Sequence, residues 1–168
     1  MRKDLPKKLL GELLKNSKRS DRELAKILGV SQPTVTRARN RLEKKGIIQD
    51  YTIIPNFKEL GFEILAFTYA KMRPEFFEQE TLEEARRDAQ KFPDAICISE
   101  GEGLGTNLLI VSFNKNYTEY SARVRRMRRH WKDFILDIES FIVPIGEREI
   151  KRFSLAYLKD TIYPAEAQ

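Results

Sequence analysis

Residues 32–41 contain polar side chains of the types that hydrogen-bond to the edges of DNA bases. Arginine pairs with guanine, asparagine or glutamine pairs with adenine, and hydroxyl groups bind to either. The expected base-contacting residues are Gln32, Thr34, Thr36, Arg37, Asn40 and Arg41. A polar helix face can also simply meet water, so the elements that would position these side chains decide between the two interpretations.

Cations and hydroxyls on both sides of this stretch are of types that bind phosphate. The expected phosphate-binding residues are Arg19, Ser20, Arg22, Lys26, Ser31, Arg39, Lys44 and Lys45. Residues 1–56 hold 14 Lys and Arg against 6 Asp and Glu, whereas residues 57–168 hold 17 against 19. The excess of positive charge is therefore confined to the N-terminal third, where it favours binding to a polyanion through counterion release.

Two helices joined by a tight turn would position these side chains. Ser20 and Glu23 have the spacing of a capping box at a helix start, and Gly29 is typical of a helix end. Ser31 and Pro33 then favour the start of a second helix. The apolar positions expected on the buried faces of the two helices are Leu24, Ile27, Leu28, Val35, Ala38 and Leu42.

Elements on either side complete a small DNA-binding domain. Residues 6–15 predict an earlier helix, whose four leucines close a three-helix core. Residues 47–54 contain two β-prone runs and predict a short hairpin, the wing, which in such domains lies along the sugar-phosphate backbone. The sequence therefore predicts a winged helix-turn-helix domain over residues 1–55.

A second domain is expected after a linker at residues 56–61. Residues 62–72, 95–100, 107–113 and 135–145 predict strands, and residues 74–92 and 117–132 predict helices. The order β-α-β-β-α-β predicts a ferredoxin-like sandwich over residues 62–146, so the fold class is α+β. One face of such a sheet is bare, and its apolar residues favour pairing with a second subunit. Cys97 is expected to be a small buried hydrophobe.

The phrase LGVSQPTVTRARNRLEKKGIIQDYTIIPN and the Leu60-Gly61 pair after it resemble the recognition helix and wing of the Lrp/AsnC family of prokaryotic transcription regulators. The resemblance covers nearly the whole chain and is looser in the second domain. It implies a sequence-specific regulator that binds double-stranded DNA as a homodimer, a tetramer or an octamer. It also implies a second domain that, in many members, binds a small effector, often an amino acid.

Two positions depart from the family's pattern. Arg39 stands where an aliphatic residue is usual, so we expect Ala38 to fill that space while Arg39 extends its stem and offers its guanidinium to a phosphate. The turn between the middle strands lacks the family's Gly-Asp-Tyr-Asp type sequence, so an effector need not be an amino acid. This turn is either a plain strand connection or an effector-contacting loop of Gly101, Gly103, Gly105, Thr106 and Asn107.

Two further segments keep more than one interpretation. The arginine-rich run at residues 123–132 is a solvated face, a subunit-pairing face or an extra contact to wrapped DNA. The C-terminal extension, residues 147–168, is either a strand or a short helix. We expect it to pack on the second domain or on a partner subunit.

An enzyme is the rival class, and the sequence offers little chemistry for one. His130 is the single histidine, and no metal-binding spacing surrounds it, so we expect no catalytic residue, metal or cofactor. The alternative is a related protein without a regulatory role, such as a siroheme-decarboxylase-type subunit or a ligand-binding module. No apolar run approaches the ~18–20 residues of a membrane span, and no signal peptide is recognised. We therefore expect a cytoplasmic protein.

Overall fold

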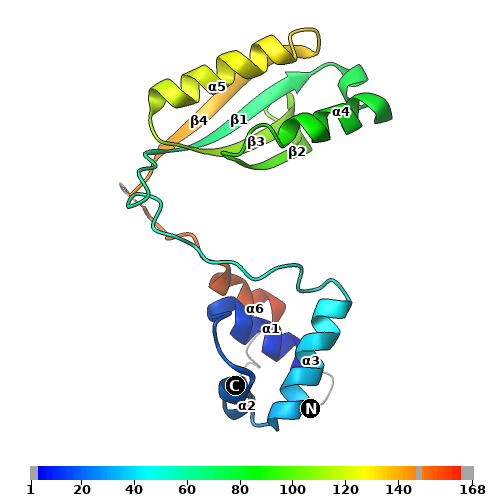
Figure 1. The fold of residues 1–168 in the computed structure, drawn as a ribbon, viewed down its shortest axis with the longest axis vertical. Coiled ribbons are helices and arrows are strands. Elements are labelled where there is room, and N and C mark those ends of the chain that lie inside the picture. The colour runs from blue at the N-terminus through cyan, green and yellow to red at the C-terminus, as the bar shows by residue number, and fades with distance from the viewer. Residues whose placement is uncertain (1–3, 147–148, 164–168) are drawn as a thin grey trace. The chain divides into compact units, whose positions relative to one another are not determined.

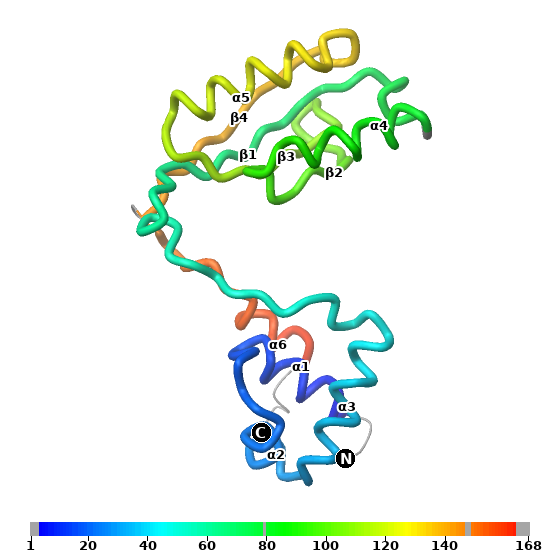
Figure 2. The backbone as a smooth tube through the Cα atoms, in the orientation of Figure 1, coloured from blue at the N-terminus to red at the C-terminus, as the bar shows by residue number. Residues whose placement is uncertain are grey.

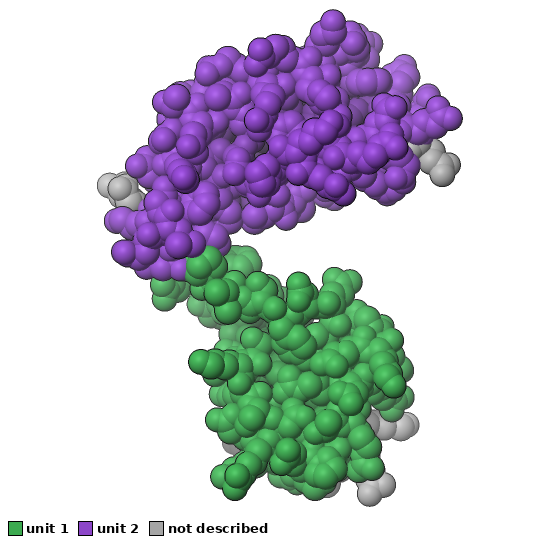
Figure 3. Space-filling model, in the orientation of Figure 1, with its two compact units in different colours: residues 1–55, 150–168 green, residues 56–149 purple. Residues whose placement is uncertain are grey.

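The computed structural model describes residues 4–146 and 149–163, apart from the side chain of Gln79, and it separates the chain into two compact units (Figures 1 and 3). Unit 1 combines the chain up to Pro55 with the segment from Ile150 onward, and unit 2 is Asn56–Glu149. No helix in the described parts is long and apolar enough to cross a membrane.

Unit 1 is built on three helices, α1 (Leu5–Lys15), α2 (Asp21–Leu28) and α3 (Gln32–Lys44). Their shared core is made by the residues Leu9, Leu13, Leu24, Ala25, Val35 and Leu42. Ile27 is 51% exposed, so its expected place in the core is wrong. Ala25 is buried instead, because α2 turns the side of Leu24 and Ala25 toward its neighbours.

The turn between α2 and α3 has the local signals that the sequence predicts. The Ser20 Oγ accepts a hydrogen bond from the Glu23 backbone N–H at 3.3 Å, and the Glu23 carboxylate accepts one from the Ser20 N–H at 2.8 Å, which completes the capping box. Gly29 adopts φ +64°, a left-handed conformation that costs a residue with a Cβ more than glycine. Pro33 lies in the first turn of α3. These features fix where α3 begins relative to α2.

The expected wing hairpin is wrong in its secondary structure, because residues 47–55 contain no strand. Tyr51, Ile53 and Ile54 are 43%, 82% and 51% exposed, so the two apolar runs find little to pack against. An isolated two-stranded hairpin is marginal in water without a buried face. Among residues 47–55, only Ile48 packs against the three-helix core.

The C-terminal segment is helical and packs on unit 1, which corrects the expectation that it packs on the second domain or on a partner. A 3-10 turn at Leu155–Leu158 leads into α6 (Lys159–Ile162), and both lie beside α1 (Figure 2). The Lys159 Cγ comes within 3.0 Å of the position that a Cβ would occupy at Gly11, so glycine allows this close approach. The Lys8 ammonium lies 5.1 Å from the centre of the Tyr163 ring. Residues 147–148 and 164–168 of the extension lie outside the described residues.

Unit 2 has the predicted ferredoxin-like order. Strands β1 (Ile64–Met72), β2 (Ala95–Gly103), β3 (Thr106–Asn114) and β4 (Ile135–Pro144) pair antiparallel in the order β2-β3-β1-β4. Helices α4 (Gln79–Ala89) and α5 (Tyr117–His130) cover one face (Figure 1). The core between them comprises Ala70, Met72, Phe76, Phe92, Leu108, Ile110, Met127, Trp131 and Ile138. The first helix is shorter than expected, because Pro74–Phe77 form a separate 3-10 turn.

The other face of this sheet has no helix over it in the described residues. Phe67 of β1 lies directly opposite Phe141 of β4, and Phe141 is 65% exposed. Cys97 lies opposite Val111 on the edge strand β2 and is exposed, so the expectation of a buried cysteine is wrong. An apolar β-run predicts a strand, but it does not tell whether another layer covers its face.

Candidate nucleic-acid interface

One face of α3 presents four polar side chains to solvent. Gln32, Arg37, Asn40 and Arg41 are all exposed. Within the described part of the chain, none of these four side chains takes part in a hydrogen bond or an ion pair. Their donors and acceptors are therefore available to a ligand. The opposite face of α3 is anchored by Val35 and Leu42, which are 0% and 4% exposed.

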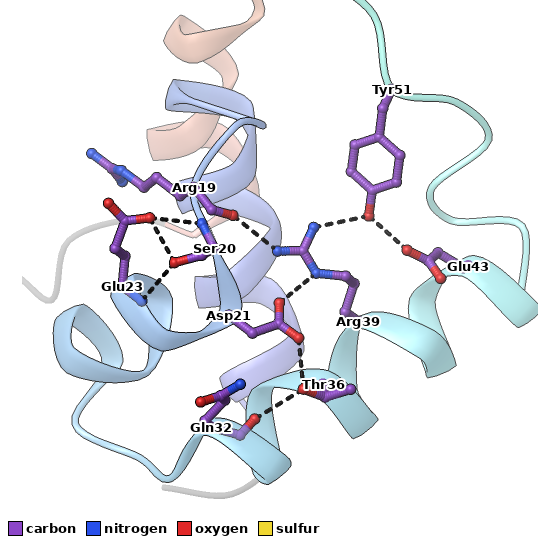
Figure 4. Close-up of polar contacts among 9 residues, drawn as sticks. All are labelled: Arg19, Ser20, Asp21, Glu23, Gln32, Thr36, Arg39, Glu43 and Tyr51. Atoms are coloured by element: carbon purple, nitrogen blue, oxygen red, sulfur yellow. Dashed lines mark hydrogen bonds and ion pairs between the residues drawn. The ribbon is translucent and has the colours of Figure 1, made fainter.

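Two other residues expected to contact DNA are engaged inside the unit (Figure 4). The Thr36 hydroxyl lies 2.6 Å from Oδ2 of Asp21. The Arg39 Nε donates to Oδ1 of the same carboxylate at 2.8 Å, and its two Nη atoms donate to the Tyr51 hydroxyl at 3.2 Å and the Arg19 carbonyl at 3.3 Å. The Arg39 side chain is 16% exposed, and its guanidinium, which was expected to reach a phosphate, joins α2, α3 and residue 51.

Tyr51 continues this network and holds the segment after α3 in place. Its hydroxyl donates to Oε1 of Glu43 at 2.7 Å while accepting from Arg39. Burial and the Glu43 carboxylate raise the pKa of Tyr51, and they outweigh the opposite effect of Arg39. Burial alone would lower the pKa of Arg39, but Tyr51 and Asp21 outweigh it and raise that pKa. The tyrosine therefore stays protonated and the arginine stays charged.

Sequence reasoning missed Asp21 and Tyr51 as partners of Arg39, and Glu43 as the partner of Tyr51. A signal was present, because a charged residue at an otherwise apolar position needs a counter-charge or hydrogen-bond partners nearby. Asp21 is the first residue of α2, where a carboxylate is also favoured by the helix dipole. These contacts bring α2 and α3 together at a fixed angle, and thereby set the direction of the exposed face of α3.

The expected phosphate-binding residues fall into two groups. Arg22, Lys26, Lys44 and Lys45 are exposed and form no ion pair within the described residues. The others have partners inside the unit: Arg19 contacts Glu12, Ser20 caps α2, the Ser31 hydroxyl lies 2.8 Å from that of Thr34, and Arg39 belongs to the network above.

Glu12 on α1 is a further charged residue that sequence reasoning missed. It is 8% exposed and forms ion pairs with Lys15 at 3.0 Å, with Lys159 at 3.5 Å and with Arg19. Burial would raise the pKa of Glu12, but the hydrogen bonds from Lys15 and Arg19 outweigh it and lower that pKa. This carboxylate ties the C-terminal segment and the loop before α2 to the same helix.

A separate small cleft lies in unit 2 at the turn between β2 and β3. Leu104 and Gly105 both adopt positive φ, +52° and +71°, which makes this a tight hairpin turn and a strand connection. The cleft has a volume of about 190 Å³ and is lined by Tyr69, Gly101, Glu102, Gly103, Leu104, Thr106, Leu108 and Leu109. Asn107 is not among these, because its side-chain amide bonds to the Met72 backbone at 2.7 and 2.8 Å.

Comparison with known sequences supports the N-terminal assignment. Residues 2–49 match a family model described as winged helix-turn-helix DNA-binding. The HTH-type transcriptional regulator Ptr1 of Methanocaldococcus jannaschii is 33% identical over 99 residues, which cover 55% of this chain and 67% of that protein. The HTH-type transcriptional regulator LrpA of Pyrococcus abyssi is 42% identical over 67 residues, which cover 40% of this chain and about half, 48%, of LrpA.

Solved structures share the fold of both units. An AsnC family transcriptional regulator from Agrobacterium tumefaciens superposes with a TM-score of 0.74 at 21% identity, over 92% of this chain and 97% of that one. A transcriptional regulator of Neisseria meningitidis, solved in complex with L-Met, gives the same TM-score at 19% identity and the same coverages. At these identities the likeness shows the fold.

The capped two-helix unit with an exposed polar face defines a helix-turn-helix DNA-binding protein, followed here by a four-stranded antiparallel sheet with its helices. The two superposed structures share this arrangement over both units. The chain belongs to the Lrp/AsnC family, and it is a DNA-binding transcriptional regulator.

Proposed function

We propose that this regulator recognises a specific DNA sequence by inserting α3 into the major groove. The observation that carries the proposal is the group of four exposed side chains on α3, Gln32, Arg37, Asn40 and Arg41, which have no partner within the described residues. Thr34 and Thr36 lie on the same helix and contact bases through their methyl groups or after a hydroxyl rotates. The protein acts in the cytoplasm as a regulator and not as an enzyme.

Phosphate contacts on both sides of α3 would fix its register on the duplex. Arg22 and Lys26 on α2, with Lys44 and Lys45 at the end of α3, have exposed charges for this role. The other expected phosphate-binding residues have an indirect role in DNA binding, because their side chains hold the α2–α3 unit together. These are Arg19, Ser20, Ser31 and Arg39. Phosphate contacts of this kind set orientation and affinity, whereas base contacts set sequence preference.

The protein binds DNA as a homodimer or a higher oligomer formed through the uncovered face of the unit 2 sheet. Phe67 and Phe141 lie opposite each other there, and Leu65 lies opposite Val143 in the same pair of strands. Contiguous apolar surface of this kind is uncommon on monomers and marks association sites. A Phe141→Asp variant should therefore sediment as a monomer at concentrations where the wild type is a dimer. An unchanged sedimentation coefficient would contradict this interface.

The cleft at the β2–β3 turn is the proposed site of a small-molecule effector. Its volume of about 190 Å³ suits a ligand of amino-acid size, and Glu102 is the one charged residue in its lining. Glu102 favours a ligand with an amino group. The complex of a structural relative with L-Met supports the same class. Amino acids added one at a time should raise the melting temperature if one binds. The same response in a Leu109→Trp variant, which narrows the cleft from a position outside the core of unit 2, would place the ligand elsewhere.

Selection of bound fragments from random duplex DNA tests the proposed function. Purified wild-type protein at moderate salt should enrich a partly palindromic motif, because a two-fold symmetric dimer presents two α3 helices to two half-sites. The Arg37→Ala/Arg41→Ala variant should keep the dimer and lose the enrichment. Recovery of unselected DNA by the wild type, lost as salt rises, would contradict sequence-specific recognition.

A further inference from the structure

Positive charge in unit 2 is densest at the C-terminal end of one helix. Residues 56–149 hold 14 Lys and Arg against 17 Asp and Glu, so the unit as a whole is slightly acidic. Six of those 14 cations lie within residues 123–132, which contain no acidic residue. This stretch comprises the last two turns of α5 and the turn that follows it.

Three of the six cations have partners within unit 2. Arg123 is 7% exposed, and its Nη2 donates to Oδ2 of Asp94 at 2.5 Å. The Arg126 guanidinium lies 4.8 Å from the centre of the Phe92 ring. The Arg128 Nη2 donates to the Ile138 carbonyl at 3.2 Å. The packing of the unit accounts for these three residues.

The other three, Arg125, Arg129 and Lys132, have no such role, and we call them the basic ridge. All three are exposed, and none forms an ion pair within the described residues. Among these three side chains, only that of Arg125 has a hydrogen bond to the part of the chain that the structure describes, from its Nη1 to the Ser121 hydroxyl at 2.6 Å. Arg125 and Arg129 are one helical turn apart, about 6 Å along the axis, and like charges at this spacing disfavour a helix.

Helix α4 of the same unit provides a comparison, because two exposed cations on it or just after it pair with acidic residues. On α4 and the turn after it, Arg86 pairs with Glu83 at 2.5 Å and Lys91 pairs with Asp88 at 2.5 Å. The helix dipole favours Arg129 and Lys132 near the C-terminus of α5, but it does not explain why acidic residues are missing between positions 123 and 132. A repulsive row of charges becomes favourable when a polyanion lies against it.

We propose that the basic ridge binds the phosphate backbone of duplex DNA, as a second contact in addition to that of α3. The inference rests on the DNA-binding function, because DNA held through α3 presents phosphates to the same protein at a high effective concentration. Other polyanions would have to be recruited separately. Point charges without a bidentate fit to base edges add affinity and salt dependence, and they add no sequence preference.

The test is the salt dependence of DNA binding by the full-length protein. The ridge variant carries Arg125→Gln, Arg129→Gln and Lys132→Gln. The matched control carries Lys58→Gln, Arg87→Gln and Lys115→Gln, which removes equal charge from exposed residues of unit 2 that have no ion pair in the described structure. Fluorescence anisotropy gives the dissociation constant on a duplex with the selected motif and long flanks, from about 50 to 200 mM salt.

We expect the slope of log K against log salt to become shallower by about 0.9 for each lost contact, and by up to about 2.7 for the ridge variant. The control should keep the wild-type slope. The ratio of affinities for the motif and for scrambled DNA should stay unchanged in the ridge variant. An unchanged slope, or an equal change in the control, would overturn the proposal.

Two further measurements separate the ridge from its alternatives. Sedimentation of the ridge variant should match that of the wild type, and dissociation into smaller species would show that the ridge pairs subunits and overturn the proposal. In an Arg37→Ala/Arg41→Ala background, the residual binding should weaken again when the ridge is removed. Failure of α3 recognition would abolish the motif preference, whereas failure of the ridge proposal leaves that preference intact.

Discussion

Removing the carboxylate of Asp21 should destabilise unit 1 and leave unit 2 unaffected. This carboxylate accepts from Arg39 Nε at 2.8 Å and from the Thr36 hydroxyl at 2.6 Å. The side chains of Arg39 and Asp21 are 16% and 19% exposed, so the pair is neither fully buried nor freely solvated. Hydrogen bonds to charged groups contribute about 1.5–3 kcal/mol each, and exposed ion pairs contribute less. We expect Asp21→Ala to cost about 2–3 kcal/mol.

A double-mutant cycle isolates the pair. The Asp21→Ala/Arg39→Ala variant should be about 1–2 kcal/mol more stable than the sum of the single changes predicts, because each single change already breaks the shared contact. Arg41→Ala, an exposed change on the same helix, is the control and should shift stability by less than about 0.5 kcal/mol.

Hydrogen exchange and tryptophan fluorescence report the two units separately. Exchange of α3 amides gives the free energy of opening of unit 1. Trp131, the single tryptophan, is buried in unit 2, so its fluorescence transition in urea should stay unchanged. A coupling energy near zero would refute the argument that Asp21 and Arg39 hold α2 against α3. So would an equal loss of stability in unit 2.

Three other changes test particular contacts. Glu12 has a pKa below its ordinary value of about 4.5, so its contribution is present above that pH and is lost as pH falls through the folded pKa; Glu12→Gln should remove this acid-dependent part of unit 1 stability in urea titrations below pH 5. Gly29→Ala should cost about 1 kcal/mol in the opening free energy of α2, because φ is +64° and no atom within 4 Å obstructs the methyl; a stability equal to wild type would contradict the left-handed cap. Ending the chain at Ser154 removes α6 and the half-buried Ile162, and it should lower unit 1 stability by about 1–2 kcal/mol; unchanged exchange of α1 amides would show that α6 does not support it.

Local signals explain why much of unit 1 could be predicted from the sequence. The Ser20–Glu23 capping box, Gly29 and Pro33 each act within a few residues, so the type of residue determines the backbone nearby. The order of strands and helices in unit 2 follows from hydrophobic periodicity in the same way. Buried Val35 and Leu42, and the exposed polar face opposite them, are confirmed on this basis.

Contacts between distant residues could not be predicted in this way. The wing hairpin needs a surface to cover its apolar residues, and neither Ile53 nor Ile54 finds one in the described structure. The network of Arg39 joins residues 18 and 20 positions away in sequence, and α6 packs on α1 from the other end of the chain. Cys97 lies in a strand as expected, but it is exposed. Its burial would need another layer over that face of the sheet, which the sequence pattern does not specify.

The most direct test of the central claim is the affinity of wild type and Arg37→Ala for the selected motif and for each single base-pair variant of it, at one salt concentration. We predict that wild type discriminates at several positions. We also predict that Arg37→Ala loses about 1–3 kcal/mol on the motif and no longer discriminates at one base pair. A uniform loss on every sequence would mean that Arg37 contacts only a phosphate. A wild type that binds all variants equally would contradict recognition of a sequence by α3.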